Sequence, residues 1–451
     1  MSGIGALFLI FLLGCGWYTG RRLSWFCFVH PVKTVRRLFS RRTVSAETDT
    51  ADKEQTQTGA GYSPVRALTV ALAGTLGVGN ITGVAAAIAL GGPGALFWMW
   101  VSALCTMLIK YAEVVLAVET RESIPVTRCG KTMREYHGGP MRYFAYYRHG
   151  GVLTAIFCVL CIAASFVQGN LLQMTAAVSG ASTVFGTAVL PTAVVLTLLA
   201  AILVTGGRRR IAAFTETMIP LMTLLYTVMC LTVIFRNAQE LPQILGTIVS
   251  SALTPRAAGG GIAAGYGTAG MLLAMRHGCA KGVFSHEAGC GTSPISHAGA
   301  ETDDSVRQGI LGIAEVFVDT ILLCTMTGLV LLLSGFGYGM TGEDYTAAVT
   351  AAFGQWFGAA GEMFLGISMV FYAFATLVCW SFYGTECVRT LAKRHQKRWT
   401  GLYLFFYILC TLCAAYAGGG VLWSLSDGLT MAMTVLNTTA VAGLLGRVRT
   451  P

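Results

Sequence analysis

The sequence predicts an all-α integral membrane protein with about eleven transmembrane helices, and three observations support this prediction. Of the 451 residues, 54% are hydrophobic and only 12% are charged, whereas soluble domains carry roughly 25% charged residues. The apolar residues form runs long enough to cross a bilayer, which takes about 20 residues per helix. Loops rich in Lys and Arg alternate with loops that are poor in them, as expected when alternate loops face the cytoplasm.

The predicted spans are eleven apolar runs, at 2–19, 64–90, 94–118, 151–180, 184–205, 211–235, 257–275, 308–334, 361–386, 400–418 and 421–446. The first run is interpreted as a retained helix and not a signal peptide, because its basic cluster follows the apolar residues. The polar segment 43–61 is predicted to be a cytoplasmic linker. The expected units are residues 1–63, with the first helix and the linker, and two five-helix units at 64–235 and 236–451.

The distribution of Lys and Arg predicts the orientation. Of 31 such residues, 28 lie in six groups on one predicted side, and one of these groups is Arg276, Lys281 and Arg307. Arg236 and Arg256 lie on the other side. Because cytoplasmic loops are rich in Lys and Arg, we expect the N-terminus outside and the C-terminus in the cytoplasm. The net charge of +10 therefore reports topology and lipid contact, and no nucleic-acid partner is expected.

Two glycine-rich segments predict interrupted helices. The second run contains Gly74, Gly77, Gly79 and Gly83 around the polar residue Asn80, and the seventh opens with a similar glycine-rich segment at 259–270. Unwound backbone at this depth exposes carbonyls for a cation and amides for an anion, although Gly79 and Gly83 also fit close helix packing. Each segment begins a set of five helices, and two like-folded units with an odd number of spans have opposite orientations. The sequence therefore predicts an inverted repeat.

Three motifs stand out, namely GNITGVAAAIALGGPGALFWMW at 79–100, Gly282 to Gly289 around His286 and Glu287, and Glu315 to Thr320. These and other motifs resemble the alanine or glycine:cation symporter family over nearly the whole chain. The resemblance implies a leucine-transporter-type fold of five plus five helices with one extra N-terminal helix. It also implies import of a small neutral amino acid, coupled to sodium or protons, across the cell (inner) membrane, with no cofactor besides the coupling ion.

The expected substrate-binding residues combine the first interrupted helix with this resemblance. They are Asn80, Thr82, Gly83, Gln168 and Trp380. Gln168 is an amide inside a span and needs a partner there, so interhelical packing is its alternative role. Trp380 is expected to form a wall over a small substrate, and an interfacial anchor is the alternative.

The resemblance also implies a sodium site between the interrupted helix and the ninth span. Its expected residues are Leu76, Gly79 and Thr376. Family members commonly place a serine before this threonine, but this chain has Ala375, so one hydroxyl is missing. Sodium coupling is favoured, and proton coupling remains the alternative.

Ionisable residues within the spans suggest further pairs. Lys110 and Glu113 can pair at three-residue spacing, and Glu315 and Asp319 are four residues apart, either as a proton relay or in structural pairs. We expect Glu287 to bind backbone groups in a re-entrant turn. A zinc-protease motif would need a second histidine where Cys290 stands.

The leading functional prediction is a secondary symporter for alanine or glycine. A proton-coupled amino-acid transporter is the alternative within that class, and a channel or a membrane enzyme is the alternative outside it. An enzyme is not favoured, because no nucleophile with its base is found, and the chain has no Walker motif for ATP hydrolysis.

Overall fold

The computed structural model describes residues 2–39, 63–128, 131–253, 270–337, 345–414 and 419–451. Helices dominate these ranges. The N-terminal part consists of α1 (Ser2–Arg22), α2 (Phe26–Val29) and α3 (Pro31–Phe39). The expected linker at 43–61 lies outside the described residues.

The first predicted unit contains the helices that follow. They are α4 (Pro64–Thr75), the short helix η1 (Val78–Asn80), α5 (Thr82–Gly91), α6 (Gly94–Glu119), α7 (Pro140–Tyr143), η2 (Phe144–Tyr146), α8 (Gly150–Phe166), η3 (Val167–Leu171), α9 (Leu172–Phe185), α10 (Val189–Thr205) and α11 (Gly207–Arg236). Between α6 and α7, strands β1 (Glu122–Arg128) and β2 (Lys131–His137) pair antiparallel, with Glu122 opposite His137. This small hairpin departs from the all-α prediction.

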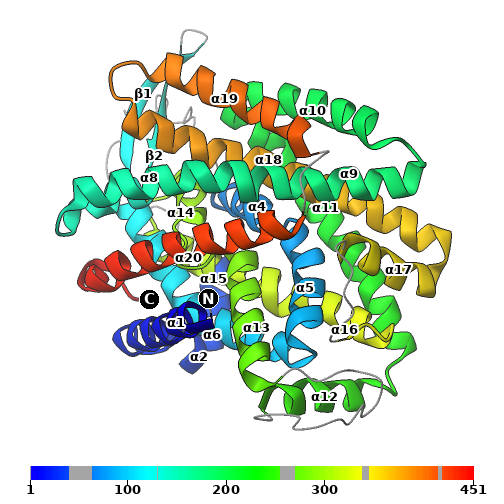
Figure 1. Cartoon of the computed structure of the whole chain (residues 1–451). Coiled ribbons are helices and arrows are strands. Elements are labelled where there is room, and N and C mark those ends of the chain that lie inside the picture. The colour runs from blue at the N-terminus through cyan, green and yellow to red at the C-terminus, as the bar shows by residue number, and fades with distance from the viewer. Residues whose placement is uncertain (1, 40–62, 129–130, 254–269, 338–344, 415–418) are drawn as a thin grey trace.

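The second predicted unit is described in the same order. Its elements are α12 (Leu241–Leu253), α13 (Met271–His286), α14 (Ser293–His297), α15 (Ser305–Val316), η5 (Phe317–Cys324), α16 (Thr325–Leu333), α17 (Tyr345–Phe357), α18 (Ala359–Leu391), α19 (Gln396–Cys413), α20 (Gly419–Gly443) and η7 (Leu445–Arg447). In Figure 1, α20 crosses the molecule between α8 and α1, and it contacts both helices.

The described residues contain five helices that are long and apolar enough to cross a membrane. They are Gly94–Glu119, Gly150–Ser182, Arg210–Arg236, Ser305–Leu333 and Ala359–Leu391. A sixth span is formed by Pro64–Thr75 and Val78–Gly91, which bend by 62° at the break between them. Helices α1, α10, α19 and α20 occupy four more of the predicted apolar runs. The chain is thus a multi-pass membrane protein.

The seventh predicted span differs from the structure. The glycine-rich segment 259–270 lies almost entirely outside the described residues, and the described helix α13 extends through the predicted loop to His286. A Cβ atom on Gly278 would contact Ala95 and Trp98, and Nε2 of His286 lies 3.5 Å from the hydroxyl of Thr106. Helix α13 therefore runs beside α6, starting near the Gly94 end of that helix.

This packing corrects two positions in the census of basic residues. Arg276 and Lys281 lie on the part of α13 that packs near the start of α6, whereas Arg121, just beyond the end of α6, binds the carbonyls of Ala298 and Thr302. Arg276 and Lys281 therefore lie toward the opposite end of α6 from the basic residues at 121–148. Arg307 does lie near the Glu119 end of α6, because Ser305 donates a hydrogen bond of 2.8 Å to Glu119.

Two spans change pitch in the middle. The helix α8–α9 contains a π-helical turn at η3, and α15–α16 contains a longer one at η5. Such turns frequently mark functional sites, because they rotate the side chains that follow. The sequence analysis did not anticipate them.

Candidate functional site

The helix formed by α4, η1 and α5, here called the first core helix, breaks where the glycines predict it. Helix α4 ends at Thr75, Leu76 forms its C-cap, and Gly77 is extended before η1 begins. A Cβ atom at Gly77 would lie 2.6 Å from Oγ1 of Thr376 and 2.8 Å from Oε1 of Gln173. Any larger residue would push these two side chains away, so Gly77 allows other helices to reach the broken backbone.

Side chains from distant elements bind the break. Gln173 on α9 accepts a hydrogen bond of 3.1 Å from the amide of Val78. The Asn80 side-chain nitrogen donates to Oδ1 of Asp319 on η5, at 2.7 Å. A Cβ atom at Gly79 would lie 3.0 Å from the Phe284 ring on α13. The break is thus the point where α9, α13, η5 and α18 converge.

Asn80 leaves one buried polar atom without a partner. It is only 5% exposed, and its carbonyl oxygen accepts no hydrogen bond from any residue that the structure describes. Buried polar groups are nearly always satisfied, and the exceptions need a specific reason. An acceptor left open beside an unwound helix can bind a cation or an ammonium group.

Thr82 and Gly83 begin the helix that follows the break. The Thr82 hydroxyl donates to the carbonyl of Val78 at 2.7 Å. A Cβ atom at Gly83 would meet only the Trp423 ring, at 3.9 Å, and this ring lies 5.1 Å from the ring of Phe284. Gly83 therefore faces a small space that Trp423 bounds.

Gln168 lies in the π-helical turn η3. Its side-chain nitrogen donates to Glu287 at 3.2 Å, its side-chain oxygen accepts from Thr430 at 2.7 Å, and its backbone carbonyl accepts from Gln173 at 3.1 Å. Gln173 in turn binds Val78. Gln168 is thus linked to the break through Gln173, and no direct hydrogen bond between Gln168 and the break is found in the described part of the chain.

Trp380 is fully buried on α18, four residues after Thr376. A Cβ atom on Gly169 would collide with its side chain, so Trp380 packs closely on the π-helical turn η3. Its indole nitrogen donates to no residue within the described ranges. The structure places Trp380 against η3, beside Gln168, and no hydrogen bond with Asn80 is found among the described residues.

The expected sodium residues lie on two sides of the break. The Thr376 hydroxyl donates to the carbonyl of Ala73 at 2.9 Å and lies next to Gly77, while Leu76 caps the same helix end. Gly79 faces Phe284 instead. The oxygen atoms near Thr376 thus come from the end of α4, and Gly79 is the expected residue that the structure sets apart from them.

A second helix break follows α13. Glu287, Gly289 and Gly291 have positive φ angles of 50°, 83° and 85°, and α14 resumes at Ser293. The Glu287 carboxylate accepts from the hydroxyl of Thr292 at 2.5 Å and from Gln168. The expectation that Glu287 binds backbone groups is therefore wrong, because two side chains take up its oxygens.

Backbone groups at this second break are bound by other residues. Glu113 on α6 accepts from the amide of Gly289 at 3.2 Å, and Asn437 on α20 donates to its carbonyl at 2.9 Å. The sequence analysis missed this role of Glu113 and the whole role of Asn437. It also missed Gln173, although its five-residue spacing from Gln168 matches a π-helical turn.

A buried ion network lies beside the second break. The Lys110 ammonium is 3.3 Å from Glu315 and 3.8 Å from Glu113, and all three side chains are fully buried. Glu315 also contacts His297 at 3.0 Å. The expected pair of Lys110 and Glu113 is thus confirmed. Asp319 has different partners, namely Asn80, Ser285 and Thr320.

Comparisons with solved structures support the fold. A manganese transporter from Eremococcus coleocola superposes with a TM-score of 0.52 at 12% identity, covering 86% of this chain and 80% of that one. At this identity the likeness concerns the fold alone. The fold is that of a membrane transporter.

Sequence relatives give the family. The sodium/alanine symporter AgcS of Methanococcus maripaludis is 35% identical, over 98% of this chain and 93% of the relative. An uncharacterized transporter of Haemophilus influenzae is also 35% identical, over 98% and 91%. The probable sodium/glutamine symporter GlnT of Bacillus subtilis is 30% identical, over 84% and 75%.

These relatives are transporters and not enzymes, and the family model for sodium:alanine symporters matches residues 4–450. The resemblance first seen in the motifs around the two breaks thus extends over the whole chain. The protein belongs to the sodium:alanine symporter family.

Proposed function

We propose that the protein is a secondary symporter that imports a small neutral amino acid, alanine or glycine, together with sodium. The observation that carries the proposal is the break at Leu76–Ile81. The side-chain carbonyl oxygen of Asn80 is buried there without a partner among the described residues, and only a small space is left at Gly83. Membership of the family supports the same reading. One relative is named as a sodium/alanine symporter.

The break offers separate groups for the two ends of an amino acid. The first amides of α5, at Thr82 and Gly83, lie at a helix N-terminus, which favours a carboxylate. The open carbonyl of Asn80 accepts hydrogen bonds, which suits an ammonium group. Gln168 and Trp380 complete the proposed site, and the small space before Trp423 limits the substrate side chain.

For the ion, we propose a site of backbone carbonyls at the end of α4 together with the hydroxyl of Thr376. The close approach of Thr376 to Ala73 and Gly77 supports it. Leu76 stays in the proposed ion site, but Gly79 lies beside Phe284 and is left out of it. The site therefore has fewer ligands than expected, and Ala375 adds no hydroxyl. We therefore expect sodium to bind weakly.

Proton coupling is the second candidate, and one contact favours it. The buried carboxylate of Asp319 lies 2.7 Å from the Asn80 side chain, directly beside the break. A carboxylate at this position can carry a proton into and out of the site. Measurement of uptake at varied sodium and varied pH separates the two ions.

For the architecture, we propose eleven spans: one extra helix in 1–63 and two inverted units at 64–235 and 236–451. The second break at 287–292, after α13, now replaces the segment 259–270 as the counterpart of the first break. The end of α13 that leads into this break lies beside η1, since a Cβ atom at Gly79 would lie 3.6 Å from Cα of Ser285. This supports an inverted repeat, because in such transporters the two broken helices meet at the site.

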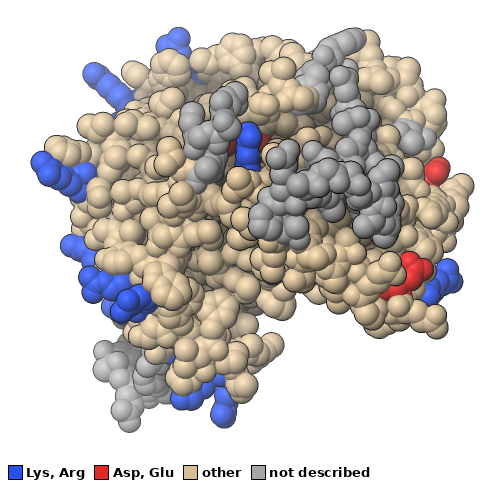
Figure 2. All heavy atoms as spheres, turned by 60° about the horizontal axis from the view of Figure 1, so that its bottom comes forward, with Lys and Arg blue, Asp and Glu red and all other residues tan. Residues whose placement is uncertain are grey.

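We further propose that the N-terminus is outside and the C-terminus cytoplasmic. In Figure 2, most of the visible Lys and Arg residues lie toward the left. Arg449 near the C-terminus pairs with Glu119 at the end of α6, close to Arg121, and this clustering of basic residues supports a cytoplasmic C-terminus. Single cysteines at the exposed positions Ser123 and Gln355 test this in intact cells. If an impermeant thiol reagent modifies Ser123→Cys but not Gln355→Cys, the orientation is the reverse of the one proposed.

The function is tested by uptake of labelled alanine into proteoliposomes with an imposed sodium gradient. We expect saturable uptake that collapses when the gradient is removed. Uptake that stays linear up to high alanine concentration would indicate a channel, and the absence of uptake for alanine and glycine under every ion gradient would reject the proposal.

A further inference from the structure

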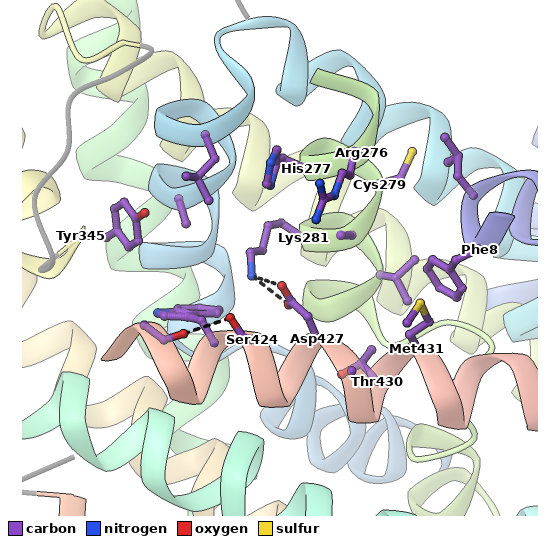
Figure 3. A pocket seen from close by; sticks show the side chains of 18 residues that line it. Phe8, Arg276, His277, Cys279, Lys281, Tyr345, Ser424, Asp427, Thr430 and Met431 are labelled. Atoms are coloured by element: carbon purple, nitrogen blue, oxygen red, sulfur yellow. Dashed lines mark hydrogen bonds and ion pairs between the residues drawn. The ribbon is translucent and has the colours of Figure 1, made fainter. Parts of the chain in front are cut away.

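A cavity of about 400 Å³ lies between α1, α5, α13 and α20. Its wall includes Ala86, Lys281, Trp423, Ser424 and Asp427. Figure 3 shows Lys281 reaching from α13 across the cavity toward Asp427 on α20. The cavity wall thus carries the opposite charges of Lys281 and Asp427, a further cation in Arg276, and the aromatic ring of Trp423.

Lys281 and Asp427 form an ion pair at this wall. The Lys281 ammonium lies 2.8 Å from each oxygen of the Asp427 carboxylate. The Lys281 side chain is 3% exposed, while that of Asp427 is 37% exposed. A buried ammonium needs a negative partner, but the partner here is accessible from the cavity.

The ion pair lies next to the break of the first core helix. The Lys281 ammonium is 4.3 Å from the centre of the Trp423 ring and 5.6 Å from that of Phe284. Gly83 lies beside the Trp423 ring, and Gly79 lies beside the Phe284 ring. The two rings therefore stand between the ion pair and the proposed substrate site.

We propose that this cavity is a second binding site for a zwitterionic amino acid, an inference that rests on the proposed function. The α-carboxylate of the ligand takes the Lys281 ammonium, and its α-ammonium takes the Asp427 carboxylate. Each protein group exchanges one partner of opposite charge for another, so the ion pair opens without leaving a buried charge alone. The bound amino acid then lies beside Trp423, which separates it from the break.

The same geometry selects against molecules with a single charge. An amine without a carboxylate would bind Asp427 and leave the buried Lys281 unpaired, and an acid without an amine would leave Asp427 unpaired. Because hydrogen bonds between charged groups are the strong ones, we expect each single-charge analogue to bind about tenfold or more weakly than the zwitterion.

The test uses a cysteine placed in the cavity wall. Ser424 is exposed there and its hydroxyl binds only its own helix, at Gly420, among the described residues. Modification of Ser424→Cys by N-ethylmaleimide is followed by mass spectrometry of the peptide that contains it, with the full chain in lipid nanodiscs. All measurements are made in a Gly83→Leu background, which blocks the proposed substrate site.

We expect alanine to slow the modification and to do so at lower concentration than alanine methyl ester or N-acetylalanine. Lys281→Met and Asp427→Asn should each remove the protection by alanine. Arg276→Met is the matched control, because Arg276 is a second cation on the same cavity wall and no ion pair between it and Asp427 is found among the described residues, and it should retain protection. Gel filtration of each variant confirms that the protein is folded.

Equal protection by alanine in Lys281→Met and the parent would overturn the inference. Uptake by proteoliposomes of the chain with Gly83 intact separates the two proposals. If uptake is normal but alanine gives no protection, the second site is rejected and the proposed function stands. If alanine is neither transported nor protective, both are rejected.

Discussion

The two helix breaks lie side by side but are satisfied to different degrees. At the first break, Asn80 keeps an open carbonyl and Gly83 faces free space. At the second break, side chains from other helices bind the Gly289 amide, the Gly289 carbonyl and the Glu287 carboxylate, and Thr292 of the break itself also binds this carboxylate. Polar groups that are fully bound hold a backbone in place, whereas groups left open can receive a ligand. We therefore propose that the first break is the binding element and that the second is its anchor.

The largest expected effect is on the anchor. Lys110→Met removes the cation from a buried network and leaves Glu113 and Glu315 without their charge partner. We expect a loss of about 3–5 kcal/mol in the free energy of unfolding, measured by thermal unfolding in detergent. The control is Arg142→Met, which breaks the ion pair with Glu122 at the surface and should cost about 0–1 kcal/mol. Similar losses in both variants would show that the network does not anchor the second break.

Gln168→Ala tests which break Gln168 serves. The substitution leaves buried partners at Glu287 and Thr430 unsatisfied, so we expect about 1–3 kcal/mol of lost stability. Because Gln168 also belongs to the proposed substrate site, the alanine concentration at half-maximal uptake should rise about tenfold. The exposed Gln243→Ala is the control. A stability loss with unchanged alanine affinity would assign Gln168 to the anchor alone.

Ala375→Ser tests the ion site beside the first break. The new hydroxyl adds a ligand next to Thr376, and a bond to a charged group contributes about 1.5–3 kcal/mol. We expect the half-saturating sodium concentration for uptake to fall about tenfold or more. Ala373→Ser, two residues away on the same buried helix, should change little. Transport that ignores sodium in all three proteins and follows pH would point to proton coupling through Asp319.

The sequence predicted the first break and most of the helices correctly. Long apolar runs with few charges became α6, α8–α9, α15–α16 and α18, because in the membrane only helices satisfy such backbone. The glycines around Asn80 predicted the bend that the structure contains.

The seventh span was misplaced for a physical reason. Arg276, His277 and Lys281 lower the hydropathy of α13, so the sequence assigned this segment to a loop. In the structure, Lys281 is paired with Asp427 at the wall of a cavity. Charges inside a bundle are tolerated when they find such partners, and one sequence cannot show a partner 146 residues away.

The site was anticipated only in part for the same reason. Asn80, Gly83 and Thr376 meet at or near the break, as expected. The contacts of Gln173 with Val78 and of Asp319 with Asn80 join helices that are far apart in sequence. They depend on tertiary packing and on two π-helical turns, neither of which has a periodic signal.

The most direct test of the first break as the binding element is alanine uptake by Gly83→Leu in proteoliposomes, beside Gly246→Leu as control. Both glycines have room for a side chain, since a Cβ at Gly246 meets nothing within 4 Å, but only Gly83 lies at the break. We predict that Gly83→Leu folds normally and loses uptake, while Gly246→Leu transports alanine like the parent. Normal alanine uptake by a folded Gly83→Leu variant would contradict the account.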